Sequence, residues 1–203
     1  CGRVADELEP GNYSSRQYLD FLGSKLTDGD SIVHQCHLHG VPMFAPAIND
    51  SSIGIGLTDH RHRCLREGRA GIAIDSIQDN YELTQLVVQS PATAAIYVAG
   101  GVPKNYINDS VVMSYIFGTE RGHDYAIQMT TAVVHDGGLS SSTLSEARSW
   151  GKIDDRADFA MAWVEPSVSL PMLAAFCFDK HPAPARKHLK LKWDGQLLKS
   201  LKR

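Results

Sequence analysis

The chain has 203 residues, which suits one domain, and its 43% hydrophobic and 21% charged residues can supply a normal globular core. The formal net charge of -3 gives no signal for a nucleic-acid partner. We see no run of about 18 apolar residues and no signal peptide, so we expect a cytoplasmic protein without a membrane partner. The four cysteines show no paired spacing, which indicates reduced thiols.

Short apolar runs alternate with amphipathic segments along the chain, after a polar stretch at residues 3–12 that is expected to be a surface arm. Helices are expected after Ser14, from Asp30 to Gly40, at 52–67 and 76–89, from Pro103, after Thr143, and at 168–178. Strands are expected at 41–44, 72–75, 93–99 and 125–130, with the last strand at 158–164. This alternation predicts an α/β fold, with a parallel sheet that has helices on both faces.

Ligands bind at the carboxyl ends of strands in an open parallel sheet. Asp50 follows the expected strand at 41–44, where it could meet a ribose or an amine; alternatively, it caps the next helix. Gly100 and Gly101 follow the strand at 93–99 and would let a phosphate or a nicotinamide approach the backbone closely. His135 and Asp136 precede a pair of glycines beyond the strand at 125–130, in a segment that suits a nucleotide-side loop.

Lys152 stands in the run SEARSWGKI, residues 145–153. Burial beside an aromatic ring lowers the pKa of a lysine, because desolvation disfavours the charged form, and a neutral lysine can hold a carbon fragment as a Schiff base. Trp150 offers a cationic ligand a ring face, and Glu146 offers it a counter-charge. These residues predict an amine-handling lysine, although such a run is also compatible with core and surface roles.

Histidines and cysteines suggest metal binding in two places, and neither set is complete. His34, His37 and His39 have no carboxylate nearby in the sequence. In the run DHRHRC, His60 and Cys64 share a helix face at i, i+4, whereas His62 points elsewhere. We therefore expect no metal site.

Four motifs together resemble the deoxyhypusine synthase family. They are PAIND (46–50), AGGVPKNYIND (99–109), HDGGLS (135–140) and SWGKI (149–153), and the resemblance runs from about Asp30 to Asp179. The branch that it resembles most is the bacterial-type deoxyhypusine-synthase-like one, which includes homospermidine synthases. The resemblance implies a Rossmann-like fold, a tetramer, and active sites at a subunit interface.

The chemistry that the resemblance implies is NAD-dependent transfer of the aminobutyl group of spermidine. NAD takes a hydride from a carbon that bears an amine of spermidine, Lys152 takes over the butylimine fragment, and an acceptor amine then displaces Lys152. The implied catalytic residue is Lys152, and the implied amine-binding residues are Trp150, Glu146, Asn105 and Asp109. The implied NAD-binding residues are Asp50, Gly100, Gly101, Thr131, Ala132, Asp136, Gly137 and Glu165. A carboxylate such as Glu165 on the ribose favours NAD over NADP.

Three positions depart from the protein-modifying members of the family. Ile55 and Leu139 stand where acidic residues would grip the amine, and Asn105 stands where a histidine would. The acceptor is therefore open: a lysine of the translation factor precursor in deoxyhypusine synthesis, or putrescine or another free amine in homospermidine-like synthesis. A non-catalytic or regulatory subunit paired with another chain is a further alternative, against which the intact Lys152 argues.

The chain begins at Cys1, whereas family members extend further at the amino terminus. A shortened polypeptide, a separately encoded N-terminal part, and cleavage of a precursor before Cys1 are all open, and Cys1 could equally be a boundary residue without a role. The expected partners are the N-terminal polypeptide of the same precursor or a paired subunit, in a homo- or hetero-tetramer. We treat residues 1–203 as a single NAD-binding domain with a basic tail at 181–203, which is either a solvated face or a site for an anionic partner.

Overall fold

The structure is a computed structural model that describes residues 1–140, 142–181 and 188–202. The fold is α/β, with parallel strands flanked by helices, as the sequence predicts. The chain divides into two compact units, Cys1–Leu83 and Thr84–Arg203. The grouping of all 203 residues into a single domain stays a prediction. Every helix among the described residues is too short or too polar to cross a membrane.

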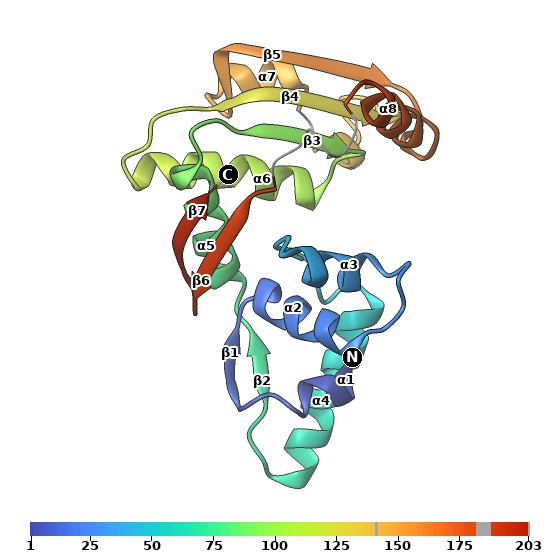
Figure 1. Cartoon of the computed structure of the whole chain (residues 1–203), viewed down its shortest axis with the longest axis vertical. Coiled ribbons are helices and arrows are strands. Elements are labelled where there is room, and N and C mark those ends of the chain that lie inside the picture. The colour runs from blue at the N-terminus through green and yellow to red at the C-terminus, as the bar shows by residue number, and fades with distance from the viewer. Residues whose placement is uncertain (141, 182–187, 203) are drawn as a thin grey trace. The chain divides into compact units, whose positions relative to one another are not determined.

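The first unit is mainly helical. Its elements are α1 (Gly2–Ala5), β1 (Gly11–Tyr13), α2 (Ser15–Lys25), α3 (Ile32–His39), α4 (Ser52–Glu67), β2 (Ile72–Ile74) and the beginning of α5 (Ser76–Gln89), as Figure 1 shows. The strands β1 and β2 pair in parallel, with Gly11 opposite Ile72. The structure confirms the predicted helices at 52–67 and 76–89. Both can be predicted from sequence because apolar spacing and serines at the amino end of a helix are local signals.

The core of the first unit lies under α2. This helix begins with a capping box in which Ser14 Oγ accepts from the Gln17 backbone N–H and the Gln17 side chain accepts from the Ser14 N–H. Its buried Tyr18 and Leu22 pack in a cluster with Ala5 and Ile72. The polar arm expected at residues 3–12 is therefore wrong: α1 and β1 form there, because a fully buried Ala5 anchors α1 against the core.

The strand expected at residues 41–44 is also wrong. These residues adopt no regular structure, and Val41 is exposed. Gly40 ends α3 in the left-handed conformation, with φ of 64°. Pro42 has no N–H to give to a ladder, so the run cannot join a sheet interior. The helix α3 itself is confirmed, but its N-cap is Ser31 rather than Asp30.

The second unit contains a parallel three-stranded sheet in the order β3-β4-β5 (Figure 1). Its elements are β3 (Ala94–Val98), α6 (Val102–Ile116), β4 (His123–Thr130), the 3-10 helix η1 (Gly137–Leu139), α7 (Leu144–Ser149), β5 (Ile153–Trp163), α8 (Pro166–Lys180), β6 (Lys190–Asp194) and β7 (Leu197–Lys202). The helix α7 packs against β5, and α8 contacts β4. Buried Tyr97, Ala126 and Ile153 belong to the core of this unit.

The strand β5 begins five residues earlier than the sequence predicts, directly after Lys152. Ile153 pairs with His123, and the register then shifts so that Asp158 pairs with Tyr125. The early part of β5 alternates poorly between apolar and polar residues, which is why its periodicity did not reveal a strand.

The tail forms an antiparallel hairpin of β6 and β7, so the strand at 158–164 is not the last one. The side chain of Gln85 on α5 donates to the Gln196 carbonyl (2.8 Å) and accepts from the Leu198 N–H (2.9 Å).

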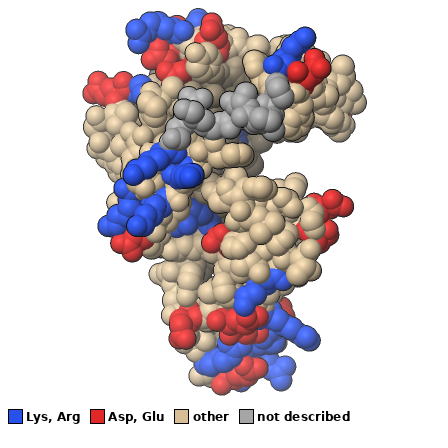
Figure 2. Space-filling view, in the orientation of Figure 1, with Lys and Arg blue, Asp and Glu red and all other residues tan. Residues whose placement is uncertain are grey.

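The basic residues of the tail are only partly described. The hairpin lysines 190, 192, 199 and 202 are exposed, whereas Arg186, Lys187 and Arg203 lie outside the described residues. Figure 2 shows acidic and basic side chains interspersed on the visible face. An anionic partner for the tail stays a prediction.

A buried ion pair joins α2 to α5 in the first unit. Arg16 Nε lies 2.7 Å from Glu82 Oε2, and the Glu82 side chain is fully buried. Replacing Arg16 with methionine leaves the Glu82 carboxylate buried without its cation. We expect Arg16→Met to lower the free energy of unfolding by about 3–5 kcal/mol, as measured by urea denaturation.

The matched control is Lys25→Met, which removes an exposed ion pair of similar length between Lys25 and Glu7 (2.6 Å). Solvent screens this pair, so the change should cost less than about 1 kcal/mol. Equal losses in the two variants would contradict a stabilising role for the buried pair.

Candidate functional site

The three parallel strands of the second unit end at one edge of the sheet. Residues predicted to bind NAD follow each strand there: Gly100 and Gly101 after β3, Thr131 and Ala132 after β4, and Glu165 after β5. The carboxyl ends of parallel strands are the usual place for a ligand in an open α/β sheet. The sheet thus brings these five residues to the same edge.

Glycines allow two loops at this edge to touch backbone to backbone. A Cβ atom on Gly100 would lie 2.0 Å from the Gly138 carbonyl oxygen, and Gly101 has φ of 75°. A larger residue at Gly100 would push the loops apart. Asp136 Oδ1 accepts from the Gly138 N–H (2.8 Å), which fixes the turn that also contains Gly137. The predicted residues Asp136 and Gly137 therefore join the same edge, and both are exposed.

Two non-glycine residues at this edge have positive φ, Ala99 (63°) and Ser140 (59°). Each such backbone costs about 1–3 kcal/mol and needs support from its surroundings. Gln128 Nε2 donates to the Ala99 carbonyl (2.8 Å), and Ser140 Oγ donates to the Gly101 carbonyl (2.9 Å). Strained, well-supported backbone of this kind is typical of functional loops.

The ammonium group of Lys104 lies under these loops and is the feature that sequence reasoning missed. The residue is 1% exposed, and its Nζ donates to Gln128 Oε1 (3.1 Å), the Leu139 carbonyl (3.1 Å) and the Ser142 carbonyl. Burial lowers the pKa of Lys104 to about 8; the charge of Lys152 lowers it further, and that of Glu146 opposes the change.

A sequence signal for Lys104 does exist. Lys104, Asn108 and Val111 are spaced i, i+4, i+7, and all three are buried on α6. Asn105 and Asp109, which the resemblance assigned to the amine, lie one residue further along and are exposed. They are spaced i, i+4, so they share the outer face of the helix.

Lys152 sits in a tight connection between α7 and β5. Its N–H donates to the Ala147 carbonyl (3.0 Å), and its own carbonyl accepts from the His123 N–H (3.1 Å). The side chain is half-buried, and Nζ lies 5.7 Å from the centroid of the Trp150 ring, within range of a cation–π contact. Trp150 is 69% exposed, so its ring is also open to a ligand.

Gly151 gives this connection its shape. Its φ is 73°, which favours glycine, and its carbonyl accepts from the Tyr115 hydroxyl (3.1 Å). Glu146 lies in the first turn of α7 and is exposed, and its N–H donates to Thr143 Oγ1 (3.2 Å), which confirms Thr143 as the cap of this helix. The turn thus holds Trp150 and Lys152 on a fixed backbone.

His123, beside Lys152, is a second buried residue that the sequence analysis did not single out. Its Nδ1 lies 2.9 Å from Thr93 Oγ1, and burial lowers its pKa to about 4. The imidazole is therefore neutral at pH 7. His123 contacts Lys152 through its backbone, because the His123 N–H donates to the Lys152 carbonyl.

The structure does not bring all the predicted residues together. Lys152 precedes β5, whereas Glu165 follows it, so the two lie beyond opposite ends of an 11-residue strand. Such a strand spans on the order of 30 Å. Glu165 Oε1 accepts from the Ser167 N–H (3.3 Å) and caps α8.

Asp50 belongs to the first unit and lies in an exposed turn, where its N–H donates to the Ala47 carbonyl (2.9 Å). Residues 41–45, directly before this turn, form no strand, so the expected strand end is wrong. The alternative of a helix N-cap is wrong too, because Ser51 caps α4 by accepting from the Gly54 N–H (3.0 Å). The assignment of Asp50 to NAD stays a prediction.

A possible metal-ligand set occurs in the first unit. Ligand atoms of Asp6, His60 and Cys64 lie within 4.8 Å of one another. However, His60 Nε2 accepts from the Ile72 N–H (3.2 Å), so His60 Nδ1 carries the proton that Asp6 Oδ1 accepts (2.8 Å). Both imidazole nitrogens are thereby occupied, and the arrangement is explained as a hydrogen-bond network between buried His60 and exposed Asp6.

The sequence is similar to that of several known proteins. The sequence profile of the family described as "DS: Deoxyhypusine synthase" matches residues 2–177. A Methanosarcina mazei protein named "Probable deoxyhypusine synthase 2" is 41% identical over 196 residues, which cover 94% of this chain and 55% of the relative. A "Deoxyhypusine synthase-like protein" of Coxiella burnetii is 40% identical over 183 residues, which cover 87% of this chain and 51% of the relative.

A "Deoxyhypusine synthase-like protein" of Caulobacter vibrioides is 37% identical over 197 residues, again 94% of this chain and 53% of the relative. The chain thus spans about half the length of the curated relatives that it matches.

The buried Lys104 ammonium generates a prediction about stability. Lys104→Met leaves the acceptors on Gln128, Leu139 and Ser142 without their donor, so we expect the free energy of unfolding at pH 7 to fall by about 1.5–3 kcal/mol. The exposed Lys190→Met serves as the control and should change it by less than about 0.5 kcal/mol.

The pH dependence of the same variant has a definite sign. Between about pH 8 and the ordinary lysine pKa of 10.5, the unfolded chain binds more protons than the folded chain at this position, so folding stability rises with pH. Denaturation over pH 7–10.5 should show this rise in the wild type relative to Lys104→Met. A constant difference between the two proteins would contradict the lowered pKa.

Proposed function

The chain belongs to the deoxyhypusine synthase family, and we propose that it takes part in NAD-dependent transfer of the aminobutyl group of spermidine to an acceptor amine. The observation that carries this proposal is the Trp150-Gly151-Lys152 turn. It presents a half-buried lysine on a doubly hydrogen-bonded backbone, with its ammonium beside an exposed tryptophan ring.

Lys152 is the proposed nucleophile. Its neutral amine attacks the imine carbon of the dehydrogenated spermidine, the bond from that carbon to the departing nitrogen breaks, and diaminopropane leaves with the proton. The butyl fragment is then held as an imine on Lys152. The acceptor amine attacks the same carbon and releases Lys152, so no further reactant is needed at this step.

Trp150 and Glu146 are proposed to bind the cationic amine. The exposed ring of Trp150 attracts an ammonium through its face, and Glu146 adds a carboxylate on the same short helix. Asn105 and Asp109 offer two further polar side chains on the outer face of α6. Asn105 can donate and accept hydrogen bonds but cannot transfer a proton.

The carboxyl edge of the sheet fits the proposed NAD. The space beside Gly100 is filled by the Gly138 carbonyl, whereas nothing lies within 4 Å of the position that a Cβ of Gly101 would take, so a ligand can approach the backbone there. Thr131 and Ala132 follow the neighbouring strand β4. The exposed carboxylates of Asp136 and Glu165 suit ribose hydroxyls. NAD would accept a hydride from spermidine and later return it.

A complete site is proposed to require more than one polypeptide. Lys152 and Glu165 lie beyond opposite ends of β5, so they are unlike a single pair of facing groups. We therefore propose a homo- or hetero-tetramer in which another copy, or an N-terminal polypeptide of the same precursor, completes the site.

The acceptor is proposed to be a lysine of the translation factor precursor, with putrescine or another free amine as the second candidate. Asn105 favours the free amine, because it replaces a titratable residue of the protein-modifying enzymes with one that cannot titrate. Leu139 is fully buried beneath the loop, so it offers no contact to an amine. A third candidate is a non-catalytic subunit in a paired complex, against which the intact Lys152 argues.

Borohydride trapping tests the proposed function. The protein, with any polypeptide that accompanies it, is incubated with NAD and spermidine, with or without putrescine, and reduced with borohydride before peptide mass spectrometry. We expect a butylamine adduct on Lys152, and homospermidine as product if putrescine is the acceptor. Lys152→Arg should abolish the adduct, and the exposed control Lys199→Arg should retain it.

Two results would contradict the scheme. NAD binding without an adduct would indicate a different amine substrate. Neither NAD binding nor an adduct would favour the non-catalytic subunit.

A further inference from the structure

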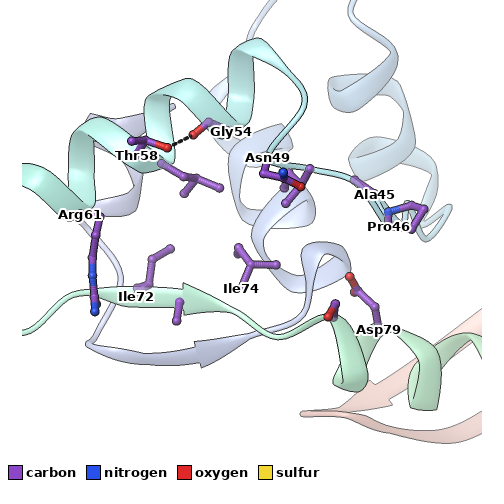
Figure 3. A pocket seen from close by; sticks show the side chains of 13 residues that line it. Ala45, Pro46, Asn49, Gly54, Thr58, Arg61, Ile72, Ile74 and Asp79 are labelled. Carbon is purple, nitrogen blue, oxygen red and sulfur yellow. Dashed lines mark hydrogen bonds between the residues drawn. The ribbon is translucent and has the colours of Figure 1, made fainter. Parts of the chain in front are cut away.

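The first unit contains a cavity of about 450 Å³ that the proposed function does not use. Its wall is built from residues 45–49, one face of α4, the strand β2 and the first turn of α5 (Figure 3). Most of this wall is apolar, with Ile48, Leu57, Ile72 and Ile74 among its residues. A cavity of this size and lining is suited to a small ligand with an aliphatic body.

A buried carboxylate forms part of this wall. Asp79 is 1% exposed, and its Oδ1 accepts from the Ser15 N–H (2.8 Å). Its Oδ2 is also buried and makes no hydrogen bond to a described residue, although the Ser15 side chain and the Arg16 N–H lie near enough to the carboxylate to oppose the rise of its pKa. Burial raises the pKa of Asp79 to about 6, so the group is still mostly ionised at pH 7. A buried oxygen of this kind calls for a donor, and a charged one satisfies it best.

The charges around Asp79 do not supply that donor. Arg16 on α2 pairs with Glu82, one turn further along α5, at 2.7 Å, so these two charges offset each other. Asp75 is occupied in capping α5, since its Oδ1 accepts from the N–H groups of Ile77 and Gln78. The negative charge of Asp79 is therefore left without a cation at this end of the cavity.

The other end of the cavity carries a positive charge. Figure 3 shows Arg61 and Asp79 at opposite ends of the row formed by Ile72 and Ile74, with Arg61 on α4. Ile72 and Ile74 are two residues apart on β2, so their side chains project from the same face of the strand. A chain of methylene groups could lie along this face, with a cation at Asp79 and a neutral or negative group at Arg61.

We propose that this cavity binds an aliphatic primary ammonium whose far end carries no positive charge, with the ammonium donating to Asp79 and the far end facing Arg61. Two sources present this chemistry: a free ω-amino carboxylic acid and a lysine side chain of a polypeptide. None of the residues that line the cavity is one of those proposed to bind the amine or NAD, although Asn49 is the sequence neighbour of Asp50. Binding in the cavity and the proposed function can therefore be tested separately.

Isothermal titration calorimetry of the full chain, with any accompanying polypeptide, tests the proposal with three probes. They are 6-aminohexanoate, Nα-acetyl-lysine N-methylamide and 1,6-diaminohexane. We expect at least one of the first two to bind and the diamine to bind about tenfold more weakly, because Arg61 repels its second ammonium. Tighter binding of 6-aminohexanoate would identify a free amino acid, and tighter binding of the amide would identify a lysine side chain.

Variants link the binding to the two charged residues. Asp79→Asn keeps the size of the side chain and the acceptor for Ser15, yet it should weaken binding at least about tenfold. Arg61→Met should remove the preference over the diamine. The control Asp30→Asn changes an exposed carboxylate outside the cavity and should leave binding unchanged.

A further variant guards against misfolding of Asp79→Asn. Thr58→Phe places a large side chain into the cavity from an exposed position on α4 and should abolish binding while Asp79 is intact. The proposal is overturned if none of the probes binds the wild type, or if Asp79→Asn binds them equally well. It is also overturned if the diamine binds the wild type as tightly as the other two. Borohydride trapping at Lys152 should be unaffected in all these variants.

Discussion

One buried ammonium group holds the carboxyl edge of the sheet in the second unit together. Lys104 connects α6 to the side chain of Gln128 on β4, to the carbonyl of Leu139 at the end of η1 and to the carbonyl of Ser142 in the loop beyond it. Burying a lysine is unfavourable unless its donors are satisfied, and the lowered pKa of Lys104 is the sign of that cost. The three acceptors offset the cost and thereby fix where the loop lies.

The glycines of the same edge depend on that fixed loop. Gly100 approaches the Gly138 carbonyl so closely that any Cβ would collide with it, and Gln128, which accepts from Lys104, also donates to the strained Ala99. Loss of one donor would therefore release both loops together. Hydrogen bonds that support strained backbone in this way pre-organise the edge for a ligand, because the ligand need not order the loops when it binds.

An element of this fold can be predicted from the sequence when the residues that determine it are neighbours in the chain. The strand before Gly100, the helix that starts near Pro103 and the cap at Thr143 all follow from a few neighbouring residues, and the structure confirms them. The run 41–44 is apolar enough for a strand, but a strand also needs a neighbour, and Pro42 cannot join a ladder. The burial of Ala5 and the hairpin at the tail depend on contacts with residues far along the chain, which periodicity does not report.

In the candidate site, too, local sequence signals can be predicted whereas long-range contacts cannot. The family motifs predict roles for Lys152 and Asn105. They give no role to the buried Lys104, because that role depends on acceptors 24–38 residues away. Asp50 was placed at a strand end that does not form. Chemistry-bearing residues can thus be found in the sequence, but their burial and partners require the fold.

The direction of β5 is the last constraint on function. It starts beside Lys152 and ends beside Glu165, so the proposed nucleophile and the proposed ribose-binding carboxylate lie beyond opposite ends of the strand. Each end also carries an exposed tryptophan, Trp150 (69%) and Trp163 (57%). Tryptophan is enriched in protein interfaces, where burying its ring stabilises association. The second polypeptide proposed above would bury such a ring if it packed against either end of β5.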